Sequence, residues 1–325
     1  MGRESVRWSD RIGRRVKLRD LHVLLAVAET RSMAKAAARL AISQPVVSKT
    51  IANLEHALGV RLLDRTSQGV EPTAYGRSFI HCGTAVFDEM RRGVQDIEFL
   101  ADPTAGEVRI ATPSPFVDFV TAAVARVAAR YPRIEWHVSE GDTPVCCRML
   151  RERKVDVGIG RLGSSVAADL ISEPLFEDHM SVVAGLHNSW ARRRRIGLAD
   201  LAGEAWVLPE ANSVGWFWID EAFRSVGVTT PKPQVISNSM SVRIGLAETG
   251  RFLTMVGSSM LRFAAAGRRL KILPTRTKTQ PVDILTLKNR TPNPIATLFI
   301  EELRALAKPL AMKRPKAKAK EARLE

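Results

Sequence analysis

In the first hundred residues, the hydrophobic positions predict helices interrupted by one pair of short strands. Residues 20–30 have apolar side chains at helical spacing, and Ser32 is placed to begin an alanine-rich second helix. A third helix begins at Ser43, has proline in its first turn and ends at Gly59. Its apolar face consists of Val47, Ile51, Leu54 and Leu58.

The second and third helices predict a helix-turn-helix. The small alanine side chains of residues 34–38 allow the two helices to cross closely, as this motif requires. Because the apolar face of the third helix points to the domain core, its polar face is left to contact something outside the domain. The sequence therefore predicts a unit that reads DNA.

A β-hairpin and a long helix follow. The extended segments 61–65 and 70–73 predict the hairpin, which would be the wing of a winged helix-turn-helix. Residues 74–100 predict one helix of about 38 Å, too long to be buried in a small domain. Its apolar stripe is therefore expected to pack against a second copy of the chain, the alternative being the core of the next domain. This stripe contains Phe79, Val86, Met90, Val94 and Ile97.

From residue 107 onward, short apolar strands alternate with helices. Strands are predicted at 108–111, 134–139, 155–159, 180–184, 205–208, 234–237, 252–256 and 282–287. Helices are predicted at 117–130, 144–153, 214–226, 240–248 and 294–308. This alternation indicates an α/β fold with a parallel sheet. Since about 200 residues is large for one small sheet, two lobes are expected.

The charge is high and unevenly distributed. The net charge of +15 favours an anionic partner, yet residues 21–100 carry only +1. Residues 1–20 carry +4 and residues 308–325 carry +5, so the ends either add phosphate contacts or are solvated tails. The arginine run 192–195 is expected to be a solvated loop.

Several classes of protein are disfavoured by what the sequence lacks. It has no signal peptide and no run of about 18 apolar residues, so a cytoplasmic protein without membrane contact is expected. Its cysteines and histidines have no metal-ligand spacing, and Cys146 and Cys147 are expected to be buried. Without a phosphate loop, a dinucleotide motif or a catalytic constellation, neither an enzyme nor a cofactor or metal is expected.

Residues 18–308 resemble the LysR-type transcriptional regulators. The resemblance is carried by Ala36-Ala37, Ser43-Gln44-Pro45, Ser48-Lys49, Ile51, Leu54-Glu55, Leu58-Gly59, Arg65 and Thr73-Ala74-Tyr75-Gly76. Pro72 and Ala52 depart from the family pattern, which commonly has leucine and arginine there. The segment 69–76 resembles the branch that regulates sugar transport and aromatic-acid breakdown, with weaker support from Leu287-Lys288-Asn289-Arg290, Pro294 and Phe299.

The resemblance implies an α/β protein with an N-terminal winged helix-turn-helix, a linker helix and an effector domain similar to periplasmic solute-binding proteins. The expected parts are a basic extension (1–17), the DNA-binding domain (18–76), the linker helix (74–100), the effector domain (107–308) and a basic tail (309–325). Lobe I would comprise 107–161 and 271–308, and lobe II 162–270. The implied partners are an interrupted inverted repeat in double-stranded DNA, a small-molecule effector and further copies in a dimer or tetramer, with RNA polymerase as an additional candidate.

The DNA-contacting candidates follow from side-chain chemistry. Gln44 can pair with adenine, Lys49 with guanine or phosphate, and Ser48 with either, while Pro45 can press on a thymine methyl group. The alternative is that these are ordinary polar residues at a helix start. The remaining candidates are Ser43, Arg65 in the wing and Arg31 at the end of the first helix, the two arginines as phosphate ligands.

Effector-contacting candidates lie where predicted strands end and helices begin, a place that favours anionic ligands. They are Ser114, Thr143, Asn212, Ser213, Ser239 and Ser241, each of which could instead be an ordinary helix cap. Trp206, Trp216, Phe217 and Trp218 could stack on a sugar or aromatic ring, but packing in the core or a subunit interface is expected.

These observations predict a transcriptional regulator controlled by a small, anionic metabolite bound between two lobes. One alternative is an architectural DNA-binding protein that responds to no ligand. Another is a solute-binding or enzymatic α/β protein, which would leave the first hundred residues without a role.

Overall fold

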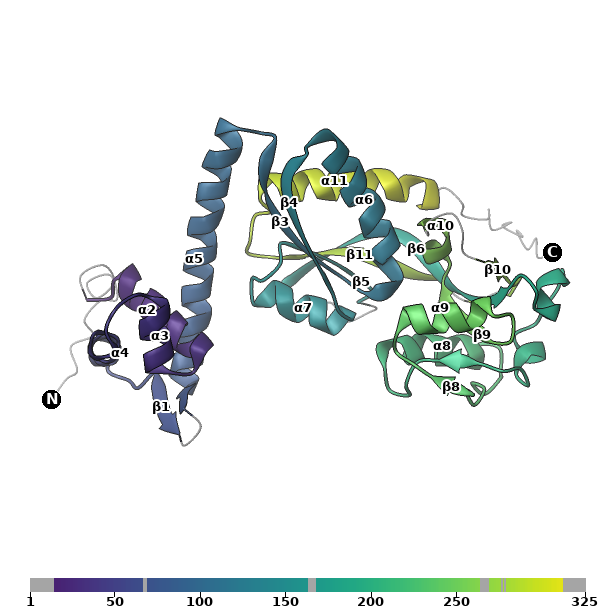
Figure 1. The fold of residues 1–325 in the computed structure, drawn as a ribbon, viewed down its shortest axis with the longest axis horizontal. Helices are drawn as coiled ribbons and strands as arrows, with labels where there is room; N and C mark the ends of the chain where they lie inside the picture. The colour runs from purple at the N-terminus through teal and green to yellow at the C-terminus, as the bar shows by residue number, and fades with distance from the viewer. Residues whose placement is uncertain are drawn as a thin grey trace, which may run out of the picture. The chain divides into compact units, whose positions relative to one another are not determined.

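A computed structural model describes residues 15–66, 69–162, 168–263, 269–275, 277 and 279–311. The chain divides into two compact units, Met1–Val94 and Gln95–Glu325 (Figure 1). Nearly all of the expected basic extension and tail therefore lie outside the described residues. No helix in the described part of the chain is long and apolar enough to cross a membrane.

The first unit is a winged helix-turn-helix, as predicted. Its elements are α2 (Leu18–Thr30), α3 (Met33–Arg39), α4 (Gln44–Leu58), β1 (Leu63–Thr66), β2 (Gly69–Pro72) and the start of α5 (Ala74–Ala101). The two strands pair as an antiparallel hairpin. Val47, Ile51 and Leu54 of α4 are buried in a core shared with α2 and α3, as their spacing predicted.

Two polar side chains fix the wing against the helices. Glu55 of α4 accepts hydrogen bonds from the backbone N–H groups of Leu62 (2.7 Å) and Leu63 (3.1 Å). Thr73 donates to the carbonyl of Arg61 (2.8 Å) and accepts from the N–H of Gly76 (3.0 Å), so it caps α5. These contacts give a physical role to Glu55 and to the Thr73-x-x-Gly76 motif.

Helix α5 has 28 residues, close to the predicted range, and its apolar stripe has two parts. Phe79 and Val86 pack against the core of the first unit instead of lying free. By contrast, Met90, Val94 and Ile97 are 50%, 54% and 68% exposed. The exposed part of the stripe therefore begins at Met90, while Val86 is half-buried against the first unit.

The second unit is built on a seven-stranded sheet in the order β10-β6-β11-β5-β3-β4, with β9 also paired to β6. The strands are β3 (Ala105–Thr112), β4 (Arg133–Glu140), β5 (Val157–Gly160), β6 (Leu170–Gly185), β9 (Leu253–Gly257), β10 (Leu270–Ile272) and β11 (Thr279–Leu287). Strands β3, β4 and β5 are parallel, but β11, β6, β9 and β10 pair antiparallel. The sheet is thus mixed, and the predicted parallel pairing holds only for β3, β4 and β5 within it.

Strand β6 has 16 residues and runs through two parts of this unit. Its first half pairs with β11, and its second half, Met180–Gly185, pairs with β9 and β10. We call the part containing β3, β4, β5 and β11 lobe I, and the part containing β9 and β10 lobe II. Pairing places residues from Leu170 to His179 in the lobe I sheet, beyond the limit at 162 expected from the sequence.

Helices cover the sheet in both lobes (Figure 1). In lobe I, α6 (Val117–Arg130) and α11 (Pro294–Ala311) share one core with the sheet, and α7 (Thr143–Arg151) belongs to a separate core that contains Leu285. Lobe II adds the parallel pair β7 (Val207–Leu208) and β8 (Val235–Ile236). Its helices are α8 (Val214–Arg224), α9 (Met240–Glu248) and α10 (Ser258–Phe263).

The short 3-10 turns are η1 (Ser114–Phe116), η2 (Ser189–Arg192) and η3 (Ala199–Leu201). The sequence predicted none of these turns, nor α10 and β10. Trp206 is fully buried, and its indole N–H donates to the carbonyl of Leu201 at 2.8 Å. This tryptophan therefore packs in the lobe II core, as expected.

Candidate DNA-binding and effector-binding sites

The start of α4 presents the predicted DNA-contacting side chains. Gln44, Pro45 and Lys49 are exposed and Ser48 is half-buried, whereas Val47 between them is fully buried. Ser43 is the N-terminal cap by position, but its hydroxyl makes no capping hydrogen bond, contrary to prediction. An exposed polar face held by a buried apolar face is the arrangement that major-groove reading requires.

The two predicted phosphate ligands lie near the wing. Arg31 ends α2 with a left-handed backbone (φ 53°), and its side chain is exposed. Its carbonyl accepts a hydrogen bond from the N–H of Val70 (3.0 Å), and Val70 pairs with Arg65 across the hairpin. The backbone thus brings positions 31 and 65 together, although the side chain of Arg65 lies outside the described part of the structure.

In lobe I, both predicted effector residues follow the carboxyl ends of neighbouring parallel strands. Ser114 follows β3 and donates a hydrogen bond to the carboxylate of Glu140 at the end of β4. Asp142, not Thr143, caps α7 through the N–H of Val145 (3.0 Å). The Thr143 side chain is buried, and its hydroxyl accepts from the backbone N–H of Arg161 at 3.3 Å.

Arg161, which the sequence did not single out, is the cation of this region. It follows β5, its guanidinium lies 5.1 Å from the ring centroid of Phe116, and it forms a buried ion pair with Asp178 of β6. Burial lowers the pKa of Arg161, and the adjacent Asp178 opposes that shift. The Arg161 Nε atom is buried and has no hydrogen-bond partner in the described part of the chain. In the sequence, the only feature that could have pointed to Arg161 is its position as a single arginine directly after a short apolar strand.

The Asp178 carboxylate also joins the two lobes. It accepts hydrogen bonds from the hydroxyl of Ser258 (2.7 Å) and from the N–H and hydroxyl of Ser259 (both 2.9 Å) at the start of α10. Arg161, directly after β5, and two serines of α10 therefore converge on one buried carboxylate where β6 passes from lobe I to lobe II.

The lobe II candidates form a second group at the ends of β7 and β8. Ser213 caps α8 through the N–H of Trp216 (3.1 Å), and Ser239 caps α9 through the N–H of Val242 (3.4 Å). Asn212, with a φ of 70°, and Ser241 are exposed. The loops that carry them are joined by a hydrogen bond from the N–H of Glu210 to the Asn238 side chain (3.0 Å). Among the described residues, no hydrogen bond or ion pair links this group to Ser114 or Thr143.

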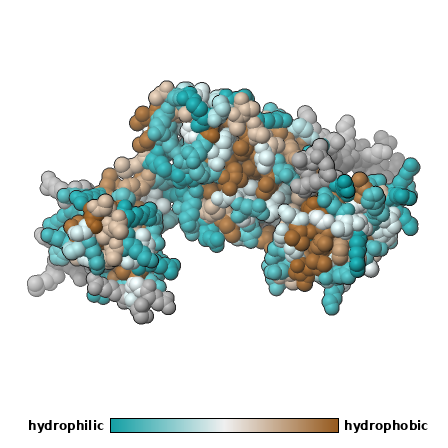
Figure 2. Space-filling view, in the orientation of Figure 1, coloured by the Kyte–Doolittle hydropathy of each residue, from teal (hydrophilic) through white to brown (hydrophobic). Residues whose placement is uncertain are grey.

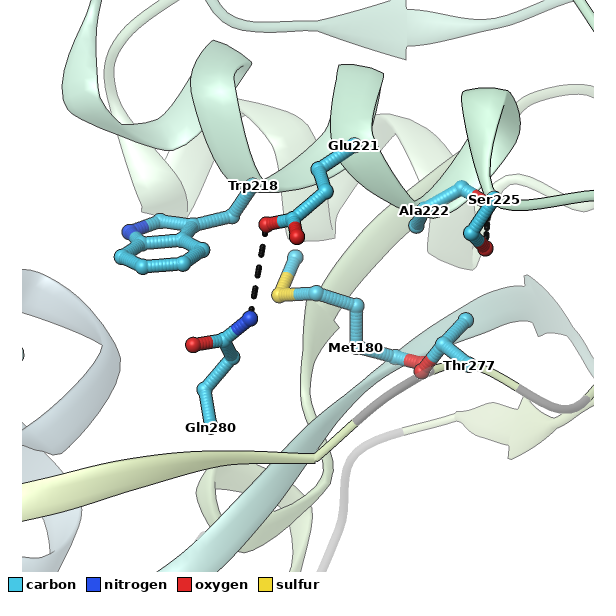
Figure 3. Close-up of a pocket in the computed structure, with 7 residues that line it drawn as sticks. All are labelled: Met180, Trp218, Glu221, Ala222, Ser225, Thr277 and Gln280. Atoms are coloured by element: carbon cyan, nitrogen blue, oxygen red, sulfur yellow. Dashed lines mark hydrogen bonds between the residues drawn. The ribbon is translucent and has the colours of Figure 1, made fainter. Parts of the chain in front are cut away.

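A small pocket beneath α8 contains none of these candidates (Figure 3). It is lined by Met180, Trp218, Glu221, Ala222, Ser225, Thr277 and Gln280. Glu221 accepts a hydrogen bond from Gln280 across it at 3.4 Å. Its volume of about 10 Å³ is the space of roughly one water molecule, too small for a metabolite.

Comparison with known proteins matches both parts of the chain. Residues 18–77 match the model of the bacterial regulatory helix-turn-helix protein, lysR family, and residues 101–308 match the LysR substrate binding domain. The HTH-type transcriptional regulator GbpR of Azospirillum brasilense is 28% identical over 296 residues, which cover 90% of this chain and 86% of GbpR.

Solved structures share the fold at low sequence identity. A full-length OxyR variant from Pseudomonas aeruginosa has a TM-score of 0.69 at 19% identity and covers 92% of this chain and 99% of its own. Full-length CbnR in complex with its target DNA has a TM-score of 0.62 at 21% identity and covers 90% of this chain and 100% of its own. Because family models account for the helix-turn-helix and for the whole α/β unit, the chain belongs to the LysR family of DNA-binding transcriptional regulators with a substrate-binding effector domain.

Proposed function

We propose that this regulator recognises an interrupted inverted repeat as a homodimer or homotetramer and responds to a small anionic metabolite. The observation that carries the proposal is the exposed face of α4, where Gln44, Ser48 and Lys49 surround a fully buried Val47. The structural neighbour CbnR is described with its target DNA, which supports the same use of the domain here.

In this proposal, base reading depends on Gln44 and Ser48, with Ser43, Pro45 and Lys49 beside them and with Arg31 and Arg65 on phosphates. Gln44→Ala or Ser48→Ala should weaken binding to the operator by about 1–3 kcal/mol and leave binding to random duplex nearly unchanged. The operator is first selected from a pool of random duplexes, and affinities are measured by fluorescence anisotropy at fixed salt.

Asn53→Ala is the matched control for Gln44, because Asn53 is an exposed polar residue two and a half turns further along α4 and on the opposite side from Gln44. It should change neither affinity. If Gln44→Ala weakened operator and random duplex equally, Gln44 would stabilise the helix and would not read bases.

We further propose that the effector binds between the lobes at the two groups of strand ends. Ser114 and Thr143 would contact it from lobe I, and Asn212, Ser213, Ser239 and Ser241 from lobe II. Arg161 supports an anionic ligand, since its buried guanidinium lies beside Phe116 and its Nε atom has no hydrogen-bond partner among the described residues. A ligand shifts the relation of the lobes only to the extent that it binds one arrangement more tightly.

A thermal-shift screen of the full chain against sugars and aromatic carboxylic acids tests the effector proposal. A true effector raises the unfolding temperature in proportion to RT ln(1 + [L]/Kd), and Ser114→Ala should reduce that shift. Ser189→Ala, at an exposed serine elsewhere in lobe II, is the control. If a ligand binds but leaves DNA bending and promoter output unchanged, the regulator is an architectural DNA-binding protein.

We also propose that the protein is cytoplasmic, has no enzymatic activity and contacts RNA polymerase at promoters. We propose the same division into domains as the sequence predicts, except that the boundary between lobe I and lobe II lies within β6. The relatives support the regulatory role, since GbpR, for example, is named a transcriptional regulator.

A further inference from the structure

Seven cations gather at the end of lobe II where β6 stops. They are Arg192, Arg193, Arg194, Arg195, Arg251, Arg269 and Lys271, which we call the distal basic patch. All seven side chains are exposed, and none forms an ion pair with another described residue. Figure 1 draws β10 at this end, and Figure 2 shows hydrophilic residues along the corresponding edge of the lobe.

The patch is assembled from three separate chain segments, which backbone contacts hold together. The N–H of Leu186, just after β6, donates to the carbonyl of Arg269 (3.1 Å). The side chain of Asn188 donates to the carbonyl of Gly250 (2.8 Å), which places Arg251 beside the same turn. These contacts place Arg251 and Arg269 beside residues 186–188, which lead into the arginine run, and Lys271 lies on β10 where it pairs with Ala184 of β6.

The arginine run itself is anchored at both sides. Ala191 before it and Ile196 after it are buried, so the four arginines span a short bridge between two core residues. The guanidinium of Arg193 lies 5.4 Å from the ring centroid of Trp190, a cation–π distance. The run is therefore a fixed surface of the lobe, which its sequence alone did not indicate.

The charge of the patch stands out from the rest of the effector domain. Residues 101–307 contain 26 basic and 21 acidic residues, and without the seven patch residues the numbers are 19 and 21. The contributing segments 186–197, 249–252 and 269–272 contain no aspartate or glutamate. Glu248 and Asp200 flank them, and Asp200 accepts from the N–H of Gly197 at 2.8 Å. A positive surface of this density attracts polyanions.

We propose that the distal basic patch binds the phosphate backbone of duplex DNA that flanks the operator. Six of its seven cations are arginines, whose planar guanidinium matches phosphate in a bidentate manner. The inference rests on operator binding by the first unit, because that unit holds the flanking DNA near the same molecule. At the high effective concentration this creates, even weak phosphate contacts add to affinity.

The test measures how the affinity of the protein for DNA depends on salt concentration. Two duplexes are compared, one of operator length and one extended by random sequence on both sides. Each phosphate contact steepens the slope of log K against log [salt] by about 0.9. The wild-type chain should show a steeper slope on the extended duplex. The variant Arg192→Gln/Arg194→Gln/Arg195→Gln keeps Arg193 on Trp190 and should flatten that slope by up to about 2.7 per protomer. This corresponds to about 40-fold in affinity between 50 and 200 mM salt.

The matched control is Arg148→Gln/Lys232→Gln/Lys288→Gln, which removes three exposed cations outside the patch. It should bind the extended duplex like the wild type. Equal slopes for patch and control variants would overturn the proposal, as would a wild-type slope that does not depend on duplex length. If the patch variant lost promoter activation but kept the wild-type salt dependence of DNA binding, the patch would instead bind an acidic protein surface.

These outcomes separate this inference from the operator proposal. Preference for the operator-length duplex over random duplex depends on Gln44 and Ser48, and the patch variant should retain it. A wild-type chain that prefers its operator but shows no length-dependent slope contradicts only the patch. A chain without any operator preference contradicts the proposed function first.

Discussion

Gly76 lies where the wing meets the long helix α5, and its lack of a side chain allows the two to approach closely. A Cβ atom at this position would lie 1.9 Å from the carbonyl oxygen of Leu62, which is backbone and cannot move aside. At Gly93, further along α5, such a Cβ would meet no other part of the described structure within 4 Å, apart from the adjacent residues and backbone of its own helix. Two glycines in the same helix therefore have opposite tolerance for alanine.

We expect Gly76→Ala to destabilise the first unit by about 1–3 kcal/mol through this overlap. Gly93→Ala should instead stabilise α5 by about 0.5–1 kcal/mol, because alanine restricts the unfolded chain more than glycine does. Native-state hydrogen exchange of amides in α2 and α4 measures both changes. Equal protection in the two variants would contradict the close approach at Leu62.

The cysteines give a second prediction at this scale. Burial raises the pKa of Cys146 to about 12 and also raises the pKa of Cys147, so both thiols stay protonated. At pH 8 only about 10⁻⁴ of a thiol with this pKa is the reactive thiolate. The folded protein should therefore show at most one fast-reacting thiol toward Ellman's reagent, that of exposed Cys82. Cys82→Ser should remove the fast phase, and two or more fast thiols in the wild type would contradict the burial.

The residues also show the limit of reading sites from sequence. Gln44 and Lys49 could be identified because helical periodicity assigns each residue of α4 to a face. Arg161 could not, since its importance depends on Asp178 and Ser259, which are 17 and 98 positions away. Periodicity describes local faces, whereas buried polar networks are made by contacts between distant segments.

Among the elements, α5 is the one whose surface requires a partner. Its exposed stripe of Met90, Val94, Ile97 and Leu100 lies beyond the residues that pack on the first unit. Met90→Lys or Val94→Lys should disrupt the dimer, because a lysine in the interface would be a buried unpaired charge. Analytical ultracentrifugation should show smaller assemblies, and operator occupancy should become non-cooperative.

His81→Lys is the control for α5, since His81 is exposed on the opposite side of the helix from Met90. Its assembly should be that of the wild type. If Met90→Lys also left the assembly unchanged, the stripe would be covered by something other than a second copy.

Most helices and strands could be predicted because each has a regular apolar pattern. Strand β6 was predicted only as 180–184, because Glu173, Pro174, Glu177 and Asp178 interrupt the pattern in its first half. Pro174 is tolerated beside a register shift in the pairing with β11. Whether neighbouring strands run parallel or antiparallel could not be predicted either, since the apolar pattern of a strand is the same in both cases.

At the scale of the whole molecule, the two units have separate cores. Calorimetry of the full chain should therefore show two unfolding transitions. Leu54→Ala removes a side chain that is 1% exposed in the first core, and should cost about 2–5 kcal/mol. At roughly 4–8 °C per kcal/mol for a domain of this size, it should lower one transition by about 10 °C or more.

Phe299→Ala is the reciprocal variant, because Phe299 is fully buried in the lobe I core. It should lower the other transition and leave the first unchanged. If either substitution moved both transitions together, the units would unfold as one cooperative body.

The course of β6 through both lobes also has a consequence during synthesis on the ribosome. Lobe II is made from one continuous stretch, so its strands β9 and β10 can pair with the second half of β6 as soon as they emerge. Lobe I must wait for β11 and α11, the last described elements of the chain. Until then, the facing edges of β5 and the first half of β6 lack the strand that pairs with both. The nascent chain is therefore most exposed to aggregation and chaperone binding while its final elements are still being translated.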